Sequence, residues 1–109
     1  MSENFLFICS RNQWRSRTAE DIFKNIKGLN VRSAGTSSSA RIKVGAKLIE
    51  WADQIFVMEK HHKHILNQRY PSLMNGKRIA ILEIPDEFQY MDQELIDMLE
   101  TAIKPYLRY

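Results

Sequence analysis

The single cysteine of the chain, Cys9, is followed at short spacing by side chains that suit phosphate chemistry. Arg15 offers a planar guanidinium that can hold two phosphate oxygens at once, which a lysine cannot do. Ser16 can donate its hydroxyl hydrogen to a sulfur anion, and Asn12 suits a tight loop because asparagine tolerates left-handed backbone. The thiolate is the nucleophilic form of cysteine, and a helix N-terminus or a guanidinium stabilises that form. The segment therefore predicts a nucleophilic cysteine beside a bound phosphate group.

The elements on either side of this segment must position it. The apolar run at residues 5–9 predicts a buried strand, and apolar residues at helical spacing over 19–26, before Gly28, predict a helix. A loop from a strand to a helix N-terminus can turn several backbone N–H groups inward, and the helix dipole strengthens this anion site. We therefore expect Cys9 and Arg15 to be catalytic in a phosphate-binding loop after the first strand. The other loop residues are predicted to bind the substrate phosphate: Ser10, Arg11, Asn12, Gln13, Trp14 and Ser16.

Three further apolar runs predict three more strands, at residues 29–34, 55–58 and 79–82. Their almost uninterrupted apolar character is typical of strands covered on both faces. Helical spacing predicts three more helices, at residues 44–52, 61–69 and 95–106. Strands that alternate with helices predict an α/β fold in which helices cover both faces of a parallel sheet. Ligands of such folds bind beyond the carboxyl ends of the strands, which is where Cys9 stands.

Length and composition predict a single domain spanning residues 1–109. Hydrophobic residues make up 44% and charged residues 27%, ordinary values for a globular protein. No apolar run approaches the roughly 20 residues that cross a bilayer, and no leader pattern is seen, so we expect a cytoplasmic protein without a membrane partner. A single thiol also fits a reducing compartment.

The net charge of +3 favours an anionic partner, which we expect not to be nucleic acid. The sequence does not predict the oligomeric state.

The loop resembles the signature of the low-molecular-weight protein tyrosine phosphatase family, Cys-x5-Arg-Ser with asparagine at the fourth position. All four signature positions match: Cys9, Asn12, Arg15 and Ser16. Residues 33–36 and 52–59 resemble the family's second-strand ending and third strand. The resemblance implies a sheet in the order 2-1-3-4 and a metal-independent phosphatase without a cofactor. It also implies a phosphocysteine intermediate, with a phosphorylated protein or a small aryl phosphate as substrate.

The resemblance further implies an aspartate near the C-terminus as general acid. The candidate is Asp86, in a loop that follows the fourth predicted strand and so lies at the same sheet edge as Cys9. In this chain Pro85 precedes the aspartate, whereas the family has the proline after it, and Asp92 is the alternative acid. Phe88 is then expected to stand beside the pocket as an aromatic wall. A protonated acid and an ionised thiol together predict a bell-shaped, mildly acidic pH profile.

Three loop positions depart from the family pattern. Arg11 stands where glycine is usual, Trp14 where a second cysteine is common, and Arg17 where proline begins the helix. The side chain of Arg11 raises the question of whether the loop backbone keeps its usual path. The chain is also shorter than a typical member between Thr36 and Asp53, a stretch that helps to wall the substrate pocket in the family. These departures leave the physiological substrate open.

Other functions share parts of this pattern. A phosphoryl carrier of the sugar-phosphotransferase IIB type also carries a phosphocysteine after its first strand, but its loop does not need an arginine at the position of Arg15. A non-catalytic phospholigand-binding module would keep the anion site without turnover. An arsenate reductase commonly relays oxidation through further cysteines, which Cys9 lacks. The spacing of His61, His62 and His64 does not suit a shared metal site, and we predict no metal.

Overall fold

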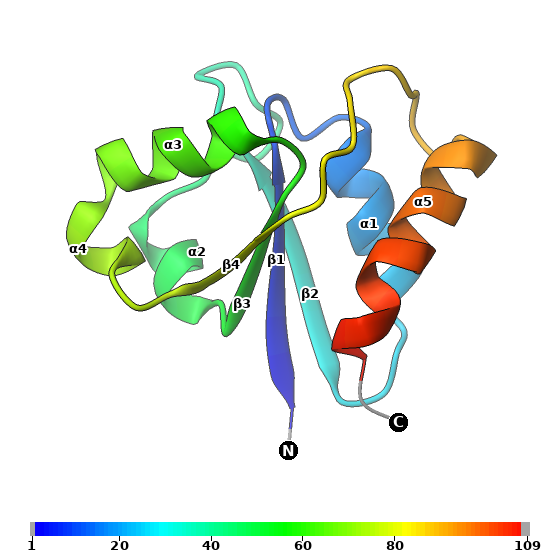
Figure 1. Cartoon of the computed structure of the whole chain (residues 1–109), viewed down its shortest axis with the longest axis horizontal. Helices are drawn as coiled ribbons and strands as arrows, with labels where there is room; N and C mark the ends of the chain where they lie inside the picture. Colours follow the sequence, from blue (N-terminus) through cyan, green and yellow to red (C-terminus); the bar gives the residue numbers. More distant parts are fainter. Residues whose placement is uncertain (1, 108–109) are drawn as a thin grey trace.

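The strands form one parallel sheet in the order β2-β1-β3-β4, as the resemblance implies (Figure 1). The computed structural model describes residues 2–107. The strands are β1 (Glu3–Cys9), β2 (Leu29–Gly35), β3 (Gln54–Val57) and β4 (Arg78–Ile81). Each agrees with a predicted apolar run to within about two residues. The α/β fold class is therefore confirmed.

Side chains alternate between the two faces of the sheet, and each face has its own core. On β1, Phe5 and Phe7 join the core beneath α1 and α5, whereas Leu6 and Ile8 join the core beneath α2, α3 and α4. The phenyl ring of Phe7 stacks on that of Phe56, with their centroids 5.0 Å apart. Because both faces are covered, every residue of β1 from Phe5 onward is apolar.

The helices are α1 (Arg15–Phe23), α2 (Ala46–Trp51), α3 (Lys60–Arg69), α4 (Pro71–Met74) and α5 (Gln93–Ile103), and a 3-10 turn, η1 (Lys104–Tyr106), follows α5. The last predicted helix stops early because Pro105 lacks an N–H and cannot continue an α-helix. α1 ends three residues before the predicted Ile26, and α4 was not predicted. Among the described residues, none of these helices is long and apolar enough to span a bilayer.

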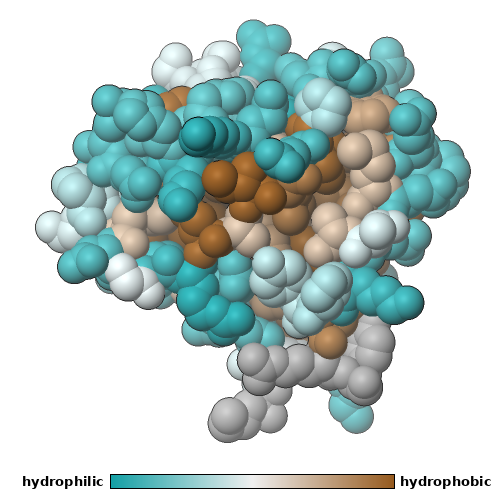
Figure 2. Space-filling view, in the orientation of Figure 1, coloured by the Kyte–Doolittle hydropathy of each residue, from teal (hydrophilic) through white to brown (hydrophobic). Residues whose placement is uncertain are grey.

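β4 is an edge strand and is covered less completely than the others. Ile79, Ala80 and Ile81 are only partly buried. The space-filling view, in the orientation of Figure 1, shows a strip of hydrophobic residues across the middle of this face with hydrophilic residues around it (Figure 2). The apolar residues that predicted this strand thus lie partly at the surface and partly against the core.

The carboxyl ends of the strands lie at one edge of the sheet. Cys9 pairs with Gly35 across β1 and β2, and the ends of β3 and β4 lie beside them. A Cβ atom on Gly35 would stand 2.4 Å from the carbonyl oxygen of Ser10 and 2.7 Å from the Cβ of Ala40. The loop after β1 can therefore cross β2 this closely only because residue 35 is glycine.

Candidate active site

The loop between β1 and α1 curls around the sulfur of Cys9 and forms one side of a cavity of about 110 Å³. Seven residues line this cavity: Cys9, Ser10, Arg11, Gln13, Trp14, Arg15 and Asp86. All seven were predicted as site residues, and they come from the loop after β1 and from the segment that follows β4. The fold thus brings the predicted nucleophile, arginine and acid to one place.

Two donors point at the Cys9 sulfur, which is 3% exposed. The hydroxyl of Ser16 lies 3.0 Å from Sγ, and the backbone N–H of Asn12 donates to Sγ over 3.3 Å. Asn12 has a φ of 57°, the left-handed conformation predicted for it, and this turn of the backbone directs its N–H inward. Both contacts stabilise a negative charge on sulfur.

A chain of side-chain hydrogen bonds holds the Ser16 hydroxyl beside the Cys9 sulfur. Asn12 Nδ2 donates to Ser16 Oγ over 2.7 Å and to Ser33 Oγ over 2.8 Å. Ser33 in turn donates to the carboxylate of Glu20 over 2.5 Å. Because Ser16 accepts a hydrogen from Asn12, its own hydrogen remains for donation. Two acceptors lie within reach, the sulfur of Cys9 at 3.0 Å and the carbonyl of Ala34 at 3.4 Å, and a thiolate on Cys9 is the nearer and the charged one. Ser33 and Glu20 were not predicted as site residues, although Ser33 lies in the stretch that resembles the family.

Arg15 is 2% exposed and is held by the loops after β3 and β4. Its Nη1 donates to Glu59 Oε1 over 2.5 Å and to the carbonyl of Ile84 over 2.9 Å. Burial raises the pKa of Glu59, but the hydrogen bond and charge of Arg15 outweigh it, so that this pKa lies below its ordinary value. A guanidinium has five N–H groups, so Arg15 retains donors for an anion in the cavity. Sequence reasoning missed Glu59 as a site residue.

Ser10 is held in the loop by a buried histidine. Ser10 Oγ lies 2.9 Å from His62 Nε2, and the backbone N–H of Glu59 donates to His62 Nδ1 over 3.1 Å. Nδ1 therefore accepts, and the ring hydrogen stands on Nε2, where it donates to Ser10. Burial, together with the charges of His61 and Arg15, lowers the pKa of His62 to about 4. His62 is thus a neutral donor at neutral pH.

Three side chains of types that can bind a metal ion lie close together beside this loop. Nitrogen and oxygen atoms of Glu59, His61 and His62 lie within 4.8 Å of one another. Both ring nitrogens of His62 already have partners, and Glu59 accepts from Arg15. These contacts orient the loop after β1, so the described geometry gives His62 and Glu59 a positioning role.

Asp86 stands at the mouth of the cavity, and Asp92 does not. The carboxylate of Asp86 lies 3.7 Å from Nε of Arg15, and its side chain is 60% exposed. Asp92 is the N-cap of α5, where its carboxylate accepts from the backbone N–H of Glu94. Of the two predicted acids, Asp86 is therefore the one placed beside Cys9.

Phe88 does not form the aromatic wall that was predicted for it. It is 8% exposed and belongs to the core cluster that also holds Phe7 and Leu95, because the chain turns inward after Asp86. The aromatic side chain on the cavity is that of Trp14, which is 43% exposed.

The segment around Phe88 is tied to α1 on its outer side. Tyr90 donates its hydroxyl to Asp21, the guanidinium of Arg17 lies 4.7 Å from the centroid of the Tyr90 ring, and the N–H of Met91 donates to Thr18. Arg17, one of the departures from the family pattern, thus helps to hold the loop that carries Asp86.

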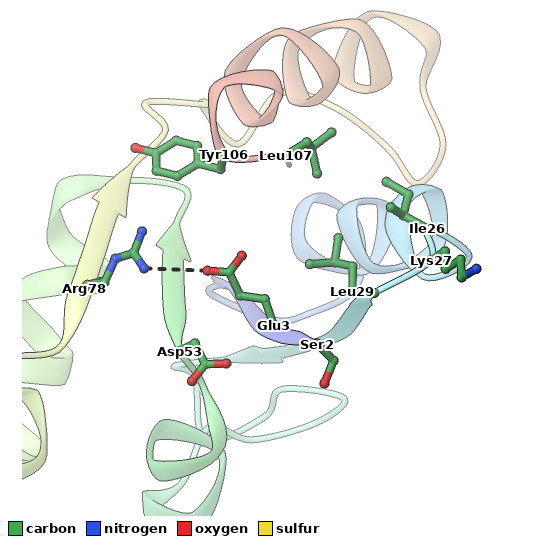
Figure 3. A pocket seen from close by; sticks show the side chains of 10 residues that line it. Ser2, Glu3, Ile26, Lys27, Leu29, Asp53, Arg78, Tyr106 and Leu107 are labelled. Atoms are coloured by element: carbon green, nitrogen blue, oxygen red, sulfur yellow. Dashed lines mark ion pairs between the residues drawn. The ribbon is translucent and has the colours of Figure 1, made fainter. Parts of the chain in front are cut away.

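A second, larger cavity lies at the opposite edge of the sheet. It has a volume of about 590 Å³ and is lined by residues at or just before the strands' amino ends, including Glu3, Leu29, Asp53 and Arg78, and by Tyr106 (Figure 3). An ion pair of 3.6 Å joins Arg78 to Glu3 within it. None of its lining residues lines the cavity at Cys9. The nucleophile, and not the larger volume, identifies the candidate active site.

Comparison with known proteins supports the fold. No protein-family model matches the sequence, and no curated protein matches it significantly. The tyrosine phosphatase Wzb from Escherichia coli K30, in complex with phosphate, has a TM-score of 0.78 at 23% identity over 97% of this chain and 96% of that chain. YwlE arginine phosphatase from Geobacillus stearothermophilus has a TM-score of 0.75 at 20% identity over 95% of this chain and 90% of that chain. A product-state mimic of a protein tyrosine phosphatase from Entamoeba histolytica has a TM-score of 0.73 at 21% identity over 96% and 93% of the two chains. The chain therefore has the fold of low-molecular-weight protein tyrosine phosphatases, and the predicted resemblance is confirmed at the level of the fold.

Proposed function

We propose that this chain, which has the low-molecular-weight tyrosine phosphatase fold, is a metal-independent phosphomonoesterase that acts through a phosphocysteine. The observation that carries the proposal is the convergence of Cys9, Arg15 and Asp86 on one cavity of about 110 Å³. The two donors on the Cys9 sulfur favour its nucleophilic form.

In the first step the sulfur of Cys9 attacks phosphorus in line with the ester oxygen. The S–P bond forms as the P–O bond breaks, and Asp86 gives its proton to the departing oxygen. Arg15 and the N–H groups of the loop hold the three equatorial oxygens, whose charge they stabilise in the transition state. The buried contacts of Arg15 to Glu59 and Ile84 hold the guanidinium in place for this role.

In the second step water attacks the phosphorus of the phosphocysteine. Asp86, now a carboxylate, accepts a proton from the water, and the S–P bond breaks to release inorganic phosphate. The sulfur of Cys9 leaves as a thiolate, which Ser16 and the N–H of Asn12 stabilise again. The same donors therefore assist both steps, and neither step needs a metal or a cofactor.

The proposed substrates are phosphorylated proteins and small aryl phosphates. The similar structures are described as tyrosine phosphatases and as an arginine phosphatase, which supports a phosphoryl group on a protein side chain. A thiolate nucleophile also suits a reducing compartment such as the cytoplasm.

The test is hydrolysis of aryl phosphates with a chelator present. We expect Cys9→Ser to be inactive and Arg15→Lys to lose roughly 100-fold or more, because a lysine cannot hold two equatorial oxygens. Asp86→Ala should lower kcat/KM, which reports the first step alone, by roughly 100-fold with phenyl phosphate and much less with para-nitrophenyl phosphate, whose leaving group needs little protonation. Asp92→Ala is the matched control and should stay within about twofold of the unchanged chain.

Three outcomes would contradict the proposal. Equal activity of Cys9→Ser and the unchanged chain would exclude the sulfur nucleophile. Tight phosphate binding without turnover would favour the binding module. A stable phosphocysteine that passes its phosphoryl group to an acceptor instead of water would favour the phosphoryl carrier.

A further inference from the structure

Two exposed arginines stand on loops that are joined to each other, one lining the cavity and one bonded to the loop that lines it. Arg11 lines the cavity and is exposed. The backbone N–H of Arg41 donates to the carbonyl of Arg11 over 2.9 Å, and Nε of Arg41 donates to the carbonyl of Asn12 over 3.1 Å. Arg41 is thus tied to the loop after β1 by both its backbone and its side chain, while its two terminal nitrogens make no hydrogen bond within residues 2–107.

Neither of these two arginines is in an ion pair within the described residues. Among residues 2–107, no carboxylate lies within 4.0 Å of the guanidinium of Arg11 or of Arg41. By contrast, Arg17 lies over the ring of Tyr90, whose hydroxyl is bonded to Asp21. A guanidinium without an ion-pair partner can bind an anion of a ligand without first giving up an internal ion pair.

We propose that Arg11 and Arg41 form a second anion-binding subsite, which selects phosphopeptides with acidic residues beside the phosphorylated side chain. This inference rests on the proposed phosphatase function. A cavity of about 110 Å³ takes the phosphate and the atoms next to it, so the rest of a peptide lies across the rim. A carboxylate matches a guanidinium with two parallel hydrogen bonds, and the contacts that hold Arg41 reduce the ordering that binding requires.

The proposed subsite depends on a departure from the family pattern. Arg11 occupies the loop position where the resembling family has glycine, and it is an exposed side chain there. An exposed ion pair changes affinity by up to about fivefold and is weakened by salt. The two arginines together should therefore favour an acidic peptide over a neutral one by about five- to twentyfold at low salt.

The experiment compares two phosphotyrosyl peptides that differ only in having glutamate or glutamine on both sides of the phosphotyrosine. The measured quantity is the ratio of kcat/KM for the acidic peptide to that for the neutral peptide. We expect a ratio of about five to twenty for the unchanged chain, carried mainly by KM, and a ratio below two for Arg11→Gln with Arg41→Gln. Lys27→Gln with Lys104→Gln removes the same charge away from the rim and should keep the ratio.

Two further measurements separate this inference from the proposed function. The ratio in the unchanged chain should fall toward one as ionic strength rises, which needs no substitution. Peptide binding to Cys9→Ser, measured by fluorescence anisotropy, reports the subsite without turnover. No hydrolysis of any peptide by the unchanged chain, with acidic preference kept in Cys9→Ser, would reject the phosphatase and keep the subsite. A ratio near one at low salt, or a ratio that survives the loss of both arginines, would reject the subsite.

Discussion

Protonation of His62 should make this protein markedly less stable in mild acid. The ring is fully buried, with Nε2 donating to Ser10 and Nδ1 accepting from the N–H of Glu59. A proton on Nδ1 would face the backbone N–H of Glu59, so that two donors would meet with no acceptor between them. It would also place a positive charge in the interior. The folded protein therefore resists a proton that the unfolded chain accepts readily.

The magnitude follows from the two pKa values of His62, 6.5 in an unperturbed chain and about 4 in the folded protein. At about 1.4 kcal/mol per pH unit, the difference corresponds to about 3 kcal/mol. Because the pKa is lowered on folding, the unfolded state binds more protons between these values. Stability is therefore fully present above pH 6.5, falls as the pH drops toward 4, and loses nothing more from this group below it. The free energy of unfolding of an ordinary domain is about 5–15 kcal/mol, so this loss is a substantial fraction of it.

The assay is urea unfolding, followed by tryptophan fluorescence, at several pH values from 7 to 4. His62→Gln removes the titrating ring but keeps an N–H that can reach Ser10, and His64→Gln provides a control at an exposed histidine of the same helix. Groups remote from position 62 titrate in the same way in the unchanged chain and in His62→Gln, so the difference between their unfolding free energies reports His62 and the contacts it makes with Glu59. We expect the advantage of the unchanged chain over His62→Gln to shrink by about 3 kcal/mol between pH 7 and pH 4. A difference that stays constant within about 0.5 kcal/mol would refute the assignment of a buried neutral histidine.

Three further predictions concern the contacts around the loop. Glu59→Gln should lower the free energy of unfolding by about 1–2 kcal/mol in urea titrations, because the buried Arg15 keeps a hydrogen-bond acceptor but loses its counter-charge. An unchanged free energy of unfolding would contradict this role of Glu59. Gly35→Ala should cost about 2–3 kcal/mol in the same titrations, since its Cβ meets the carbonyl of Ser10 at 2.4 Å, and an unchanged midpoint would show that the loop gives way. Asn12→Asp keeps a residue that tolerates left-handed backbone but replaces the donor of two hydrogen bonds by an acceptor. With an aryl phosphate, kcat should therefore fall roughly 100-fold. Full activity would contradict the donation from Asn12 to Ser16 and Ser33.

The sequence predicted the strands and the loop because their signals are local. β1, β3 and β4 are mostly apolar and β2 has apolar residues at alternate positions, while Cys9, Asn12 and Arg15 stand at fixed offsets within one loop. Glu59 and His62 could not be found in this way, because they reach the loop from about 50 positions away along the chain, through the pairing of β1 with β3. Only the assembled sheet brings them together.

The error at Phe88 has a different cause. The sequence shows an aromatic residue two positions after Asp86, but it does not show whether the segment runs along the surface or turns into the core. The contacts of Tyr90 and Met91 with α1 fix that path, and they direct Phe88 inward. The end of α1 was also missed, because it depends on how the helix packs and not on its sequence alone. The end of α5 could have been predicted, because Pro105 lacks an N–H and is a local signal for the end of a helix.

Burial separates the loop into two faces with different roles. The positions that match the family signature are all at most 3% exposed: Cys9, Asn12, Arg15 and Ser16. The positions that depart from it are all exposed: Arg11, Trp14 and Arg17. An anion site of this kind depends on inward-facing donors and on buried partners that hold them, so the outward face can change its charge and shape without disturbing the sulfur. Under the proposed function, the departures would bear on which phosphate esters reach Cys9, and the matches on the reaction there.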